Sequence, residues 1–536
     1  GIANDSIDFR RLEDQRVVNG SVAGDHLFGK LKVYWMASYS RASEESLNER
    51  YIRYEIGDAI PLVTDFSNTE FPFIGASNPD DVALGNWEFD ELTEENQYTE
   101  EEDINGRLDF SYPVSLSFGK GSIGFGVRAR IKTKLRDNNF FEFSPVDGLE
   151  TLADVPTDDQ SKDNYLAGEK YQAGSYATRE FLGNLDLEDP NQFEKEDAPG
   201  EYLPDNYEAS EDVYGAYLMW NQSLSDQLSF LIGARFESTS LEYTGNEVLD
   251  EEELIREVTN TADYTNLMPG IHLRYEVTPN TILRAAWTNT LARPNYFDLV
   301  PFRSIVEEDE EIFAGNPDLD PTTSMNIDIM ADHYFRSVGI LSGGIFYKQI
   351  DDFIYVLEGE DQETGFDLFQ PQNGGSADLF GFEVSFQRQL DFLPGIWKGL
   401  GIYLNYTYIN SNAEGIRNED GELREDVDLP GTAPNMFNAS LSFETKRLVL
   451  RASLNYSDAY IDELADGPFF DRYYDEQLFL DFNASYAITD NFRVFAEANN
   501  ITNQPLRYFQ GSSERTMQME YYNARVNLGF KYDLFK

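Results

Sequence analysis

The last stretch of the chain, residues 521–536, constrains the fold more than any other, because its side chains alternate in character with a period of two. The apolar and aromatic positions are Tyr522, Ala524, Val526, Leu528, Phe530, Tyr532 and Leu534. The residues between them are polar or charged, so the pattern predicts a strand with two different faces. Such faces suit a barrel wall with lipid outside and water inside. A register shift of one residue would put Arg525 and Lys531 into lipid, at about 2–4 kcal/mol each.

Composition fits one large β-structure in a membrane. Aromatic residues make up 14% of the 536 residues, and girdles at two membrane interfaces would use them. No apolar run approaches the length of about 20 residues that a membrane-spanning helix needs, which excludes an α-helical membrane protein. The sequence has no cysteine, which excludes disulfides, thiolate metal sites and cysteine nucleophiles.

The chain is strongly acidic, with 97 Asp and Glu against 41 Lys and Arg and a formal net charge of -56. This charge opposes binding to nucleic acid. Most of the acid lies between the predicted strands, as at residues 91–103 and 307–311. Two interpretations stay open: solvated loops adapted to high salt, or a site for a divalent cation or cationic ligand. Residues 1–5 lack the pattern of a signal peptide, so we expect a mature form or a fragment.

Alternating segments recur along the chain, joined by connections of two lengths. A break is predicted at residues 24–26, and the next strand at residues 31–40. Short turns are predicted at residues 118–121, 223–226, 278–280, 336–339, 394–397, 445–447 and 489–491. Long loops are predicted up to about Glu102, at residues 138–210, and around Asp250, Glu308, Glu360, Asp420, Asp466 and Ser512. This alternation predicts an all-β fold, a large antiparallel transmembrane β-barrel with short periplasmic turns and long extracellular loops.

The number of strands has a consequence for closure. Counting back from a last strand that ends in the periplasm gives about 17 strands, and the first of them runs downwards from the extracellular side. A bacterial barrel has an even number of strands and no open edge. We therefore expect further strands to come from outside these residues.

Several stretches carry a family resemblance: residues 284–287, 291–296, 315–321, 344–348 and 498–503, together with the final strand. In these the chain resembles the TonB-dependent outer-membrane receptors, especially the branch associated with glycan and other nutrient uptake. The resemblance implies a barrel of 22 strands around an amino-terminal plug. Residues 1–536 would then be the carboxy-terminal portion of such a receptor, lacking the plug and about the first five strands. Lys536 departs from the family's usual aromatic last residue.

The resemblance also implies a function and partners. The family imports nutrients across the bacterial outer membrane with energy from the TonB complex, which reaches a short box on the plug. Implied partners are the polypeptide carrying plug and missing strands, the TonB energy-coupling complex, outer-membrane lipid and lipopolysaccharide, and a surface substrate-binding lipoprotein. A glycan is the first substrate expectation, followed by peptides or metal chelates. The alternative is a passive porin-like barrel, or a structural or assembly barrel, without energy coupling.

Aromatic side chains in the predicted outer loops are the candidates for substrate binding, because flat rings suit sugar rings. These residues are Trp87, Phe89, Tyr296, Phe297, Phe302, Phe469, Phe470, Tyr473 and Tyr474. The other interpretation is that these rings pack the loops together.

Charged side chains on the predicted inner face should meet a docked plug, since facing charges in a restricted space need partners. They are Arg235, Glu237, Arg284, Arg493, Glu497 and Arg525, joined by His272, whose neighbours Ile271 and Leu273 are apolar. No catalytic motif is present, and the three histidines have no metal-ligand spacing, so we expect no enzyme and no metal cofactor. A wall hydrolase using His272 is the remaining catalytic alternative.

Calcium is the metal that the loops suit best, because it accepts several oxygen ligands from loop residues. The candidates are Asn418, Glu419, Asp420 and Glu422 around Gly421, and the pair Asp318 and Asp320. Their spacing matches no complete calcium loop.

Overall fold

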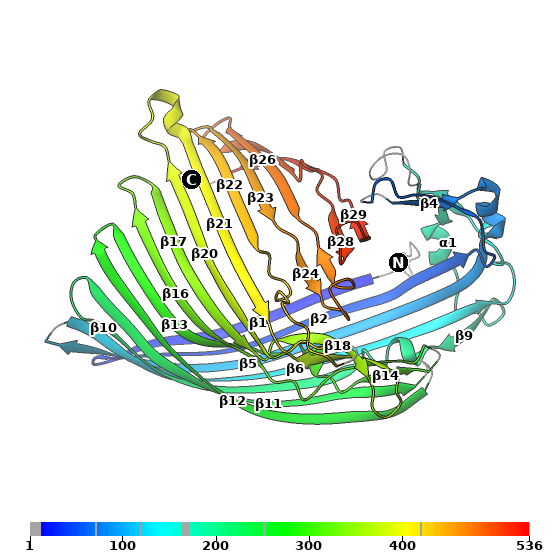
Figure 1. The fold of residues 1–536 in the computed structure, drawn as a ribbon, viewed down its shortest axis with the longest axis horizontal. Helices are drawn as coiled ribbons and strands as arrows, with labels where there is room; N and C mark the ends of the chain where they lie inside the picture. Colours follow the sequence, from blue (N-terminus) through cyan, green and yellow to red (C-terminus); the bar gives the residue numbers. More distant parts are fainter. Residues whose placement is uncertain are drawn as a thin grey trace.

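The computed structural model describes residues 12–69, 72–117, 119–162, 172–249, 253–307, 309–418 and 421–534. Most of the chain forms one sheet of 22 strands (Figure 1). Five of these are short loop strands: β9 (Phe193–Asp197), β14 (Arg303–Val306), β15 (Glu311–Ala314), β18 (Ile354–Glu360) and β19 (Asp367–Asn373). The other seventeen form a curved wall in which each strand pairs antiparallel with the next. The predicted all-β antiparallel architecture is confirmed.

The wall strands follow one another in chain order. They are β1 (Leu12–Phe28), β2 (Leu31–Glu55), β5 (Glu88–Leu116), β6 (Gly119–Pro145), β10 (Tyr207–Ser223), β11 (Leu228–Leu249), β12 (Glu253–Thr278), β13 (Thr281–Ala292), β16 (Thr322–Tyr334), β17 (Gly339–Asp351), β20 (Ser376–Gln389), β21 (Leu400–Ala413), β22 (Asn435–Glu444), β23 (Leu448–Ser457), β26 (Gln477–Ala487), β27 (Phe492–Asn499) and β30 (Arg525–Tyr532).

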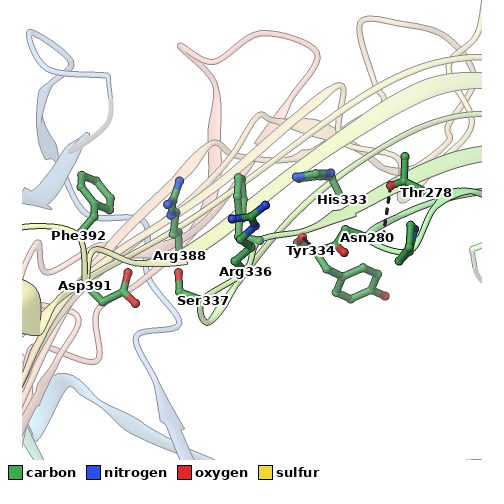
Figure 2. A pocket seen from close by; sticks show the side chains of 11 residues that line it. Thr278, Asn280, His333, Tyr334, Arg336, Ser337, Arg388, Asp391 and Phe392 are labelled. Atoms are coloured by element: carbon green, nitrogen blue, oxygen red, sulfur yellow. Dashed lines mark hydrogen bonds between the residues drawn. The ribbon is translucent and has the colours of Figure 1, made fainter.

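The connections separate into two rims, as predicted, but two of the predicted long loops are wrong in extent. β11 runs to Leu249 and β12 begins at Glu253, so the ladder replaces the long loop predicted around Asp250. The loop predicted at residues 138–210 is shorter, because β6 continues to Pro145 and β10 begins at Tyr207. Every predicted short turn joins consecutive wall strands; Phe118, within the first of them, lies outside the described residues. Figure 2 shows part of this short-turn rim, where the turn after β16 lies beside the loop after β20. The predicted break at residues 24–26 is wrong, because β1 continues to Phe28 and turns at Gly29, whose φ is 65°. The predicted loop centres Asp250, Glu308 and Asp420, and the terminal Lys536, lie outside the described residues.

The two faces of the last strand are the predicted ones. In β30 the side chains of Val526, Leu528 and Phe530 are 64%, 79% and 72% exposed, as expected of a face that meets lipid. They stand opposite Ala498, Ala496 and Val494 of β27, whereas Arg525 and Lys531 stand opposite Asn499 and Arg493. The alternation therefore continues from strand to strand.

Several strands are much longer than a membrane crossing. β2 has 25 residues and β5 has 29, whereas a crossing needs about 9–11. The prediction of a loop up to about Glu102 is wrong for residues 41–55 and 88–102, which continue the ladder beyond the membrane. Most of these carboxylates stay at least partly exposed, and basic side chains such as Arg41, which pairs with Glu100, lie on the neighbouring strand. The buried Glu94 is paired with Arg50.

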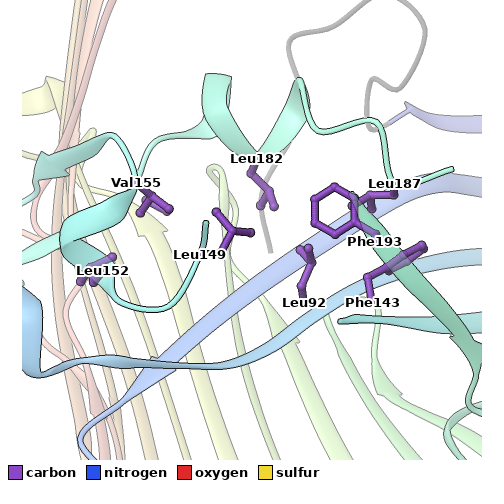
Figure 3. Packing of buried hydrophobic residues seen from close by; sticks show 9 residues of the cluster. Leu92, Phe143, Leu149, Leu152, Val155, Leu182, Leu187 and Phe193 are labelled. Atoms are coloured by element: carbon purple, nitrogen blue, oxygen red, sulfur yellow. The ribbon is translucent and has the colours of Figure 1, made fainter. Parts of the chain in front are cut away.

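The longest loop, between β6 and β10, packs a core of its own (Figure 3). It contains the short strands β7 (Thr157–Asp159) and β8 (Ser175–Ala177) and the helix α1 (Arg179–Gly183). The buried residues of this loop core are Leu92, Phe143, Leu149, Leu152, Val155, Ala177, Leu182, Leu187 and Phe193. Beneath it, Arg50 is only 1% exposed and donates to Glu94 at 2.7 Å and to the carbonyl of Leu185 at 2.9 Å.

A small second sheet stands on the long-loop rim above the last strands. It comprises β24 (Tyr460–Glu463), β25 (Arg472–Tyr474), β28 (Leu506–Gln510) and β29 (Thr516–Glu520), from two different loops. The two edges of the wall are β1 and β30, and no pairing joins them within the described ranges. On the loop side of this seam, the Thr516 hydroxyl donates to the carbonyl of Thr69 at 3.0 Å. Within the same part of the chain, no helix is long and apolar enough to cross a membrane.

Candidate functional site

The connection between β13 and β16, residues 293–321, turns inward onto the face of β10 and β11 that carries Arg235 and Glu237. We call it the in-folded loop. It begins with the helical turn α2 (Tyr296–Leu299), and Leu299 and Val300 are 2% and 0% exposed against a cluster that includes Tyr207 and Leu241. Its strand β14 pairs in parallel with the end of β11, and β15 pairs with β19. The in-folded loop therefore pairs with strands of the sheet and also covers the inner face of the sheet.

Gly315 makes the inward turn feasible. Its N–H donates to the carbonyl of Phe302 at 3.2 Å, and the N–H of Asn316 donates to the backbone carbonyl of Asp298 at 2.7 Å. A Cβ at position 315 would stand 1.9 Å from the carbonyl oxygen of Val300. Only glycine allows this close approach, which gives a structural reason for the Gly-Asn-Pro sequence.

Arg293 fastens the in-folded loop to the wall. Its Nη2 donates to Glu237 Oε2 at 2.8 Å and to Thr239 Oγ1 at 3.2 Å, and its Nε lies 3.5 Å from Glu211 Oε2. Glu237 also accepts from Arg235 at 2.5 Å. Burial works to lower the pKa of Arg293, but the hydrogen bond with Glu237 and the surrounding negative charge raise it overall. Glu211 is 6% exposed, so the loop arginine compensates a buried carboxylate.

The structure brings together three of the predicted binding residues on the in-folded loop: Tyr296, Phe297 and Phe302. The rings of Phe297 and Phe302 stack with centroids 4.8 Å apart. Lys132 Nζ lies 4.7 Å from the centroid of Tyr296, whose hydroxyl donates to Glu211 at 3.4 Å. Burial raises the pKa of Tyr296. All three rings pack against the same buried cluster and are half-buried.

Trp87 and Phe89 lie elsewhere, packed against the loop core between β6 and β10. The indole of Trp87 donates to the carbonyl of Val82 at 3.2 Å, and Phe89 meets Tyr54 edge-on at 6.0 Å. Trp87 and Phe89 thus make the contacts of side chains that pack a loop.

The remaining predicted aromatics lie in the small second sheet or in the connection between its strands β24 and β25. Phe469 and Phe470 are 59% and 46% exposed, and Arg515 lies 3.9 Å from the Phe469 centroid. Tyr473 stacks on Phe509 at 5.0 Å, and Tyr474 lies 5.0 Å from Tyr508. The nine predicted residues therefore form three separate groups on the long-loop rim.

Sequence reasoning missed the charged residues that hold these groups in place. Arg424 donates to both carboxylate oxygens of Asp471, at 2.9 and 2.6 Å, and the two side chains are 8% and 1% exposed. Arg507, 3% exposed, donates to Asp475 at 2.7 Å. These arginines lie in acidic loops, where the sequence alone does not distinguish a buried charge from a solvated one. Arg293 entered the sequence analysis only as part of the stretch 291–296 that carries the family resemblance.

The predicted inner-face charges all lie on the polar face of the wall, and some are already paired. Arg235 pairs with Glu237, Arg284 pairs with Asp332, and Arg493 donates to Ser485 at 2.9 Å. The register places Glu497 opposite Asn527 and Arg525 opposite Asn499. His272 lines a cavity of about 460 Å³ together with Arg284 and Asp328.

The calcium candidates receive no geometric support from the described ranges, where no group of three or more His, Asp or Glu side chains could hold a metal ion. Glu419 and Asp420 lie outside those ranges. Around them, the N–H of Glu422 donates to Asn418 Oδ1 at 2.7 Å, and Gly421 has φ 75°. Asp318 donates its N–H to Asn316, and Asp320 donates its own to Asn373.

The same fold occurs in solved receptors of low sequence identity. The ferric-catecholate import receptor Fiu from Escherichia coli K12 has a TM-score of 0.60 and 12% identity over 99% of this chain and 65% of that one. The pyoverdine receptor FpvA from Pseudomonas aeruginosa has a TM-score of 0.58 and 11% identity over 98% and 62%. The siderophore receptor PiuA from Acinetobacter baumannii has 0.56 and 12% over 98% and 65%. The chain thus spans less than two thirds of the length of these structures.

The sequence comparison gives the family directly. No curated protein matches the sequence significantly. The family model for the TonB-dependent receptor-like β-barrel matches residues 37–501, which is most of the chain. The chain therefore belongs to the TonB-dependent receptor β-barrel family of the Gram-negative outer membrane.

Proposed function

We propose that this chain forms most of the wall and mouth of an importer that takes up a nutrient across the outer membrane with energy from the TonB complex. The observation that carries the proposal is the in-folded loop. It lies over the inner face at the mouth and is held there by Arg293 between Glu237 and Glu211. The ordered loop supplies side chains at the mouth, which a receptor needs to meet its ligand. Passive barrels can also carry inward-folded loops, so the uptake test below separates the two functions. No catalytic step is part of this proposal.

A glycan remains our first choice of substrate. The half-buried rings of Tyr296, Phe297 and Phe302 lie on one loop, and the Tyr296 hydroxyl contacts the carboxylate of Glu211. Such rings can stack on a sugar, and a carboxylate can accept hydrogen bonds from the sugar hydroxyls. A metal chelate is the second choice, favoured by Lys132 and Lys134, which lie 4.7 and 5.7 Å from the Tyr296 centroid and would attract an anionic ligand. Fiu is a ferric-catecholate import receptor and PiuA is a siderophore receptor.

Binding to the purified chain would separate these substrates. We expect Tyr296→Leu to weaken binding of an oligosaccharide panel about tenfold, the loss of one stacking contact, without changing the melting profile. Trp87→Leu is the matched control, because its ring packs in the loop core away from this group. If ferric chelates bind and sugars do not, the glycan assignment is wrong. If neither variant changes binding of either class, the in-folded loop is not the ligand site.

Energy coupling has its own test. Uptake in cells should stop when the inner-membrane proton gradient collapses. Uptake that survives would favour the passive barrel. A hydrolytic activity lost in His272→Ala would instead revive the wall-hydrolase alternative.

We further propose that a plug and about five more wall strands complete the barrel. The free edges of β1 and β30 support this, because membrane strands leave no open edge in lipid. Intact-mass measurement of the detergent-purified particle tests it. A polypeptide that carries these parts, as a second chain or as an extension of this one, would support the proposal. A particle made of residues 1–536 alone, in which the amides of β1 and β30 are as protected from exchange as those of the inner strands, would contradict it.

A further inference from the structure

A cavity of about 630 Å³ opens on the short-turn rim, away from the mouth (Figure 2). It lies between the turn after β12, the turn after β16 and the loop after β20. Its lining includes three basic side chains and two phenyl rings, namely His333, Arg336, Arg388, Phe335 and Phe392. Asp391 is the one carboxylate in the lining.

The basic side chains of this cavity sit at the end of the lipid-facing surface. His333 stands opposite Leu341, and Leu341 stands opposite Phe386, so these three share a face. Arg388 follows Phe386 by two positions and is therefore on that face as well. Leu341 and Val384 on the same face are 42% and 44% exposed, as lipid-facing side chains are. Figure 2 shows Arg388, Phe392 and His333 projecting to one side of the sheet and Asp391 to the other.

The guanidinium of Arg388 contacts two aromatic rings but has no anionic partner among the described residues. It lies 4.4 Å from the ring centroid of Phe335 and 4.9 Å from that of Phe392. Its Nε is buried and has no hydrogen-bond partner. Within the described part of the chain, neither Arg388 nor Arg336 forms an ion pair, whereas Arg235, Arg284 and Arg293 all do.

An unpaired cation at a lipid boundary is costly unless it meets an anion. A guanidinium held between two rings can offer two parallel N–H groups, and that geometry fits the oxygens of a phosphate.

The exposed apolar residues around the cavity favour a membrane lipid as the source of that phosphate. The neighbouring turns expose Val338, Ile396 and Trp397 at 74%, 64% and 58%, and such residues anchor in the interfacial layer of a bilayer. In this family the short turns face the periplasm. We propose that the cavity binds the headgroup phosphate of a glycerophospholipid in the periplasmic leaflet, with its acyl chains along the apolar face beside Leu341.

Native mass spectrometry of the detergent-purified chain with added phosphatidylglycerol tests this site. We expect one tightly held lipid in the unmodified protein and about tenfold weaker binding in Arg388→Gln, because a charge-assisted hydrogen bond is lost. Arg388→Lys should lose less lipid affinity than Arg388→Gln, because lysine keeps the positive charge although it cannot form the bidentate contact. Arg447→Gln is the control, because it removes the same charge from another short turn of this rim and does not line the cavity.

Three results would overturn the proposal. Equal losses in Arg388→Gln and Arg447→Gln would mean that the lipid is held only by general charge. An unchanged lipid count in Arg388→Gln, with the fold verified by its heat-modifiable gel migration, would remove the site. Inorganic phosphate that binds the unmodified chain as tightly as the lipid does would show a site for the free ion rather than for a membrane lipid.

Discussion

Gly315 shows how one residue sets the position of the in-folded loop. Because a Cβ there would stand 1.9 Å from the carbonyl oxygen of Val300, Gly315→Ala must displace backbone rather than a flexible side chain. We expect the loop to be destabilised by about 1–3 kcal/mol, the usual cost of overpacking. Limited proteolysis within residues 293–321 should become at least about tenfold faster. Gly85→Ala is the control, since nothing lies within 4 Å of a Cβ there; equal rates in both variants would contradict this role.

The ion pair between Arg424 and Asp471 should matter more than any exposed pair. Both side chains are buried, at 8% and 1% exposed, so Arg424→Met would leave a carboxylate in the interior without its partner. We expect a loss of about 3–5 kcal/mol in the stability of the small second sheet. Arg256→Met, which breaks a pair whose arginine is 68% exposed, should cost less than about 1 kcal/mol. Hydrogen exchange of β25 and β28 would measure the difference, and similar protection in the two variants would refute it.

At the scale of an element, β30 offers a direct test of the two faces. Leu528 faces lipid and is 79% exposed, whereas its neighbour Asn527 faces the interior opposite Glu497. Leu528→Arg should therefore destabilise the barrel in lipid by about 2–4 kcal/mol near the midplane. Asn527→Arg, one residue away, should cost much less. Urea titration in lipid vesicles measures both, and the reverse order would mean that the register is wrong.

The sequence predicted the wall well and the mouth poorly, for physical reasons. Faces such as that of Leu528 follow from a local period of two, which needs no knowledge of distant residues. The contact between Arg293 and Glu211 joins positions more than eighty residues apart and depends on how a loop folds. Acidic residues 88–102 were predicted to be loop because their composition is that of a loop; the ladder with β2 overrides it. Trp87 was chosen for its ring, and the sequence could not show the loop core against which that ring packs.

At the scale of the whole molecule, the free edges of β1 and β30 should be visible in solution. In the described chain each pairs with a neighbour on one side only, so about half of its N–H groups lack a ladder partner. In the isolated chain we expect these amides to exchange at least about tenfold faster than those of β11, which is paired on both sides. Adding the polypeptide that completes the barrel should slow them. Uniform protection in the isolated chain would mean that the seam is closed.

The unequal lengths of the strands give the mouth two flanks with different mechanics. β5 has 29 residues, or about 95 Å of strand, and β6 has 27, whereas β27 and β30 have 8 each, about 27 Å. The strands of the tall flank are joined by backbone hydrogen bonds over most of their length, with two register shifts between β2 and β5, and this ladder resists bending. Above the short strands stands a small sheet that is braced by side-chain ion pairs and stacked rings. Among the strands that the structure describes, we therefore expect any widening of the entrance to come from the second flank, while the tall ladder keeps its position.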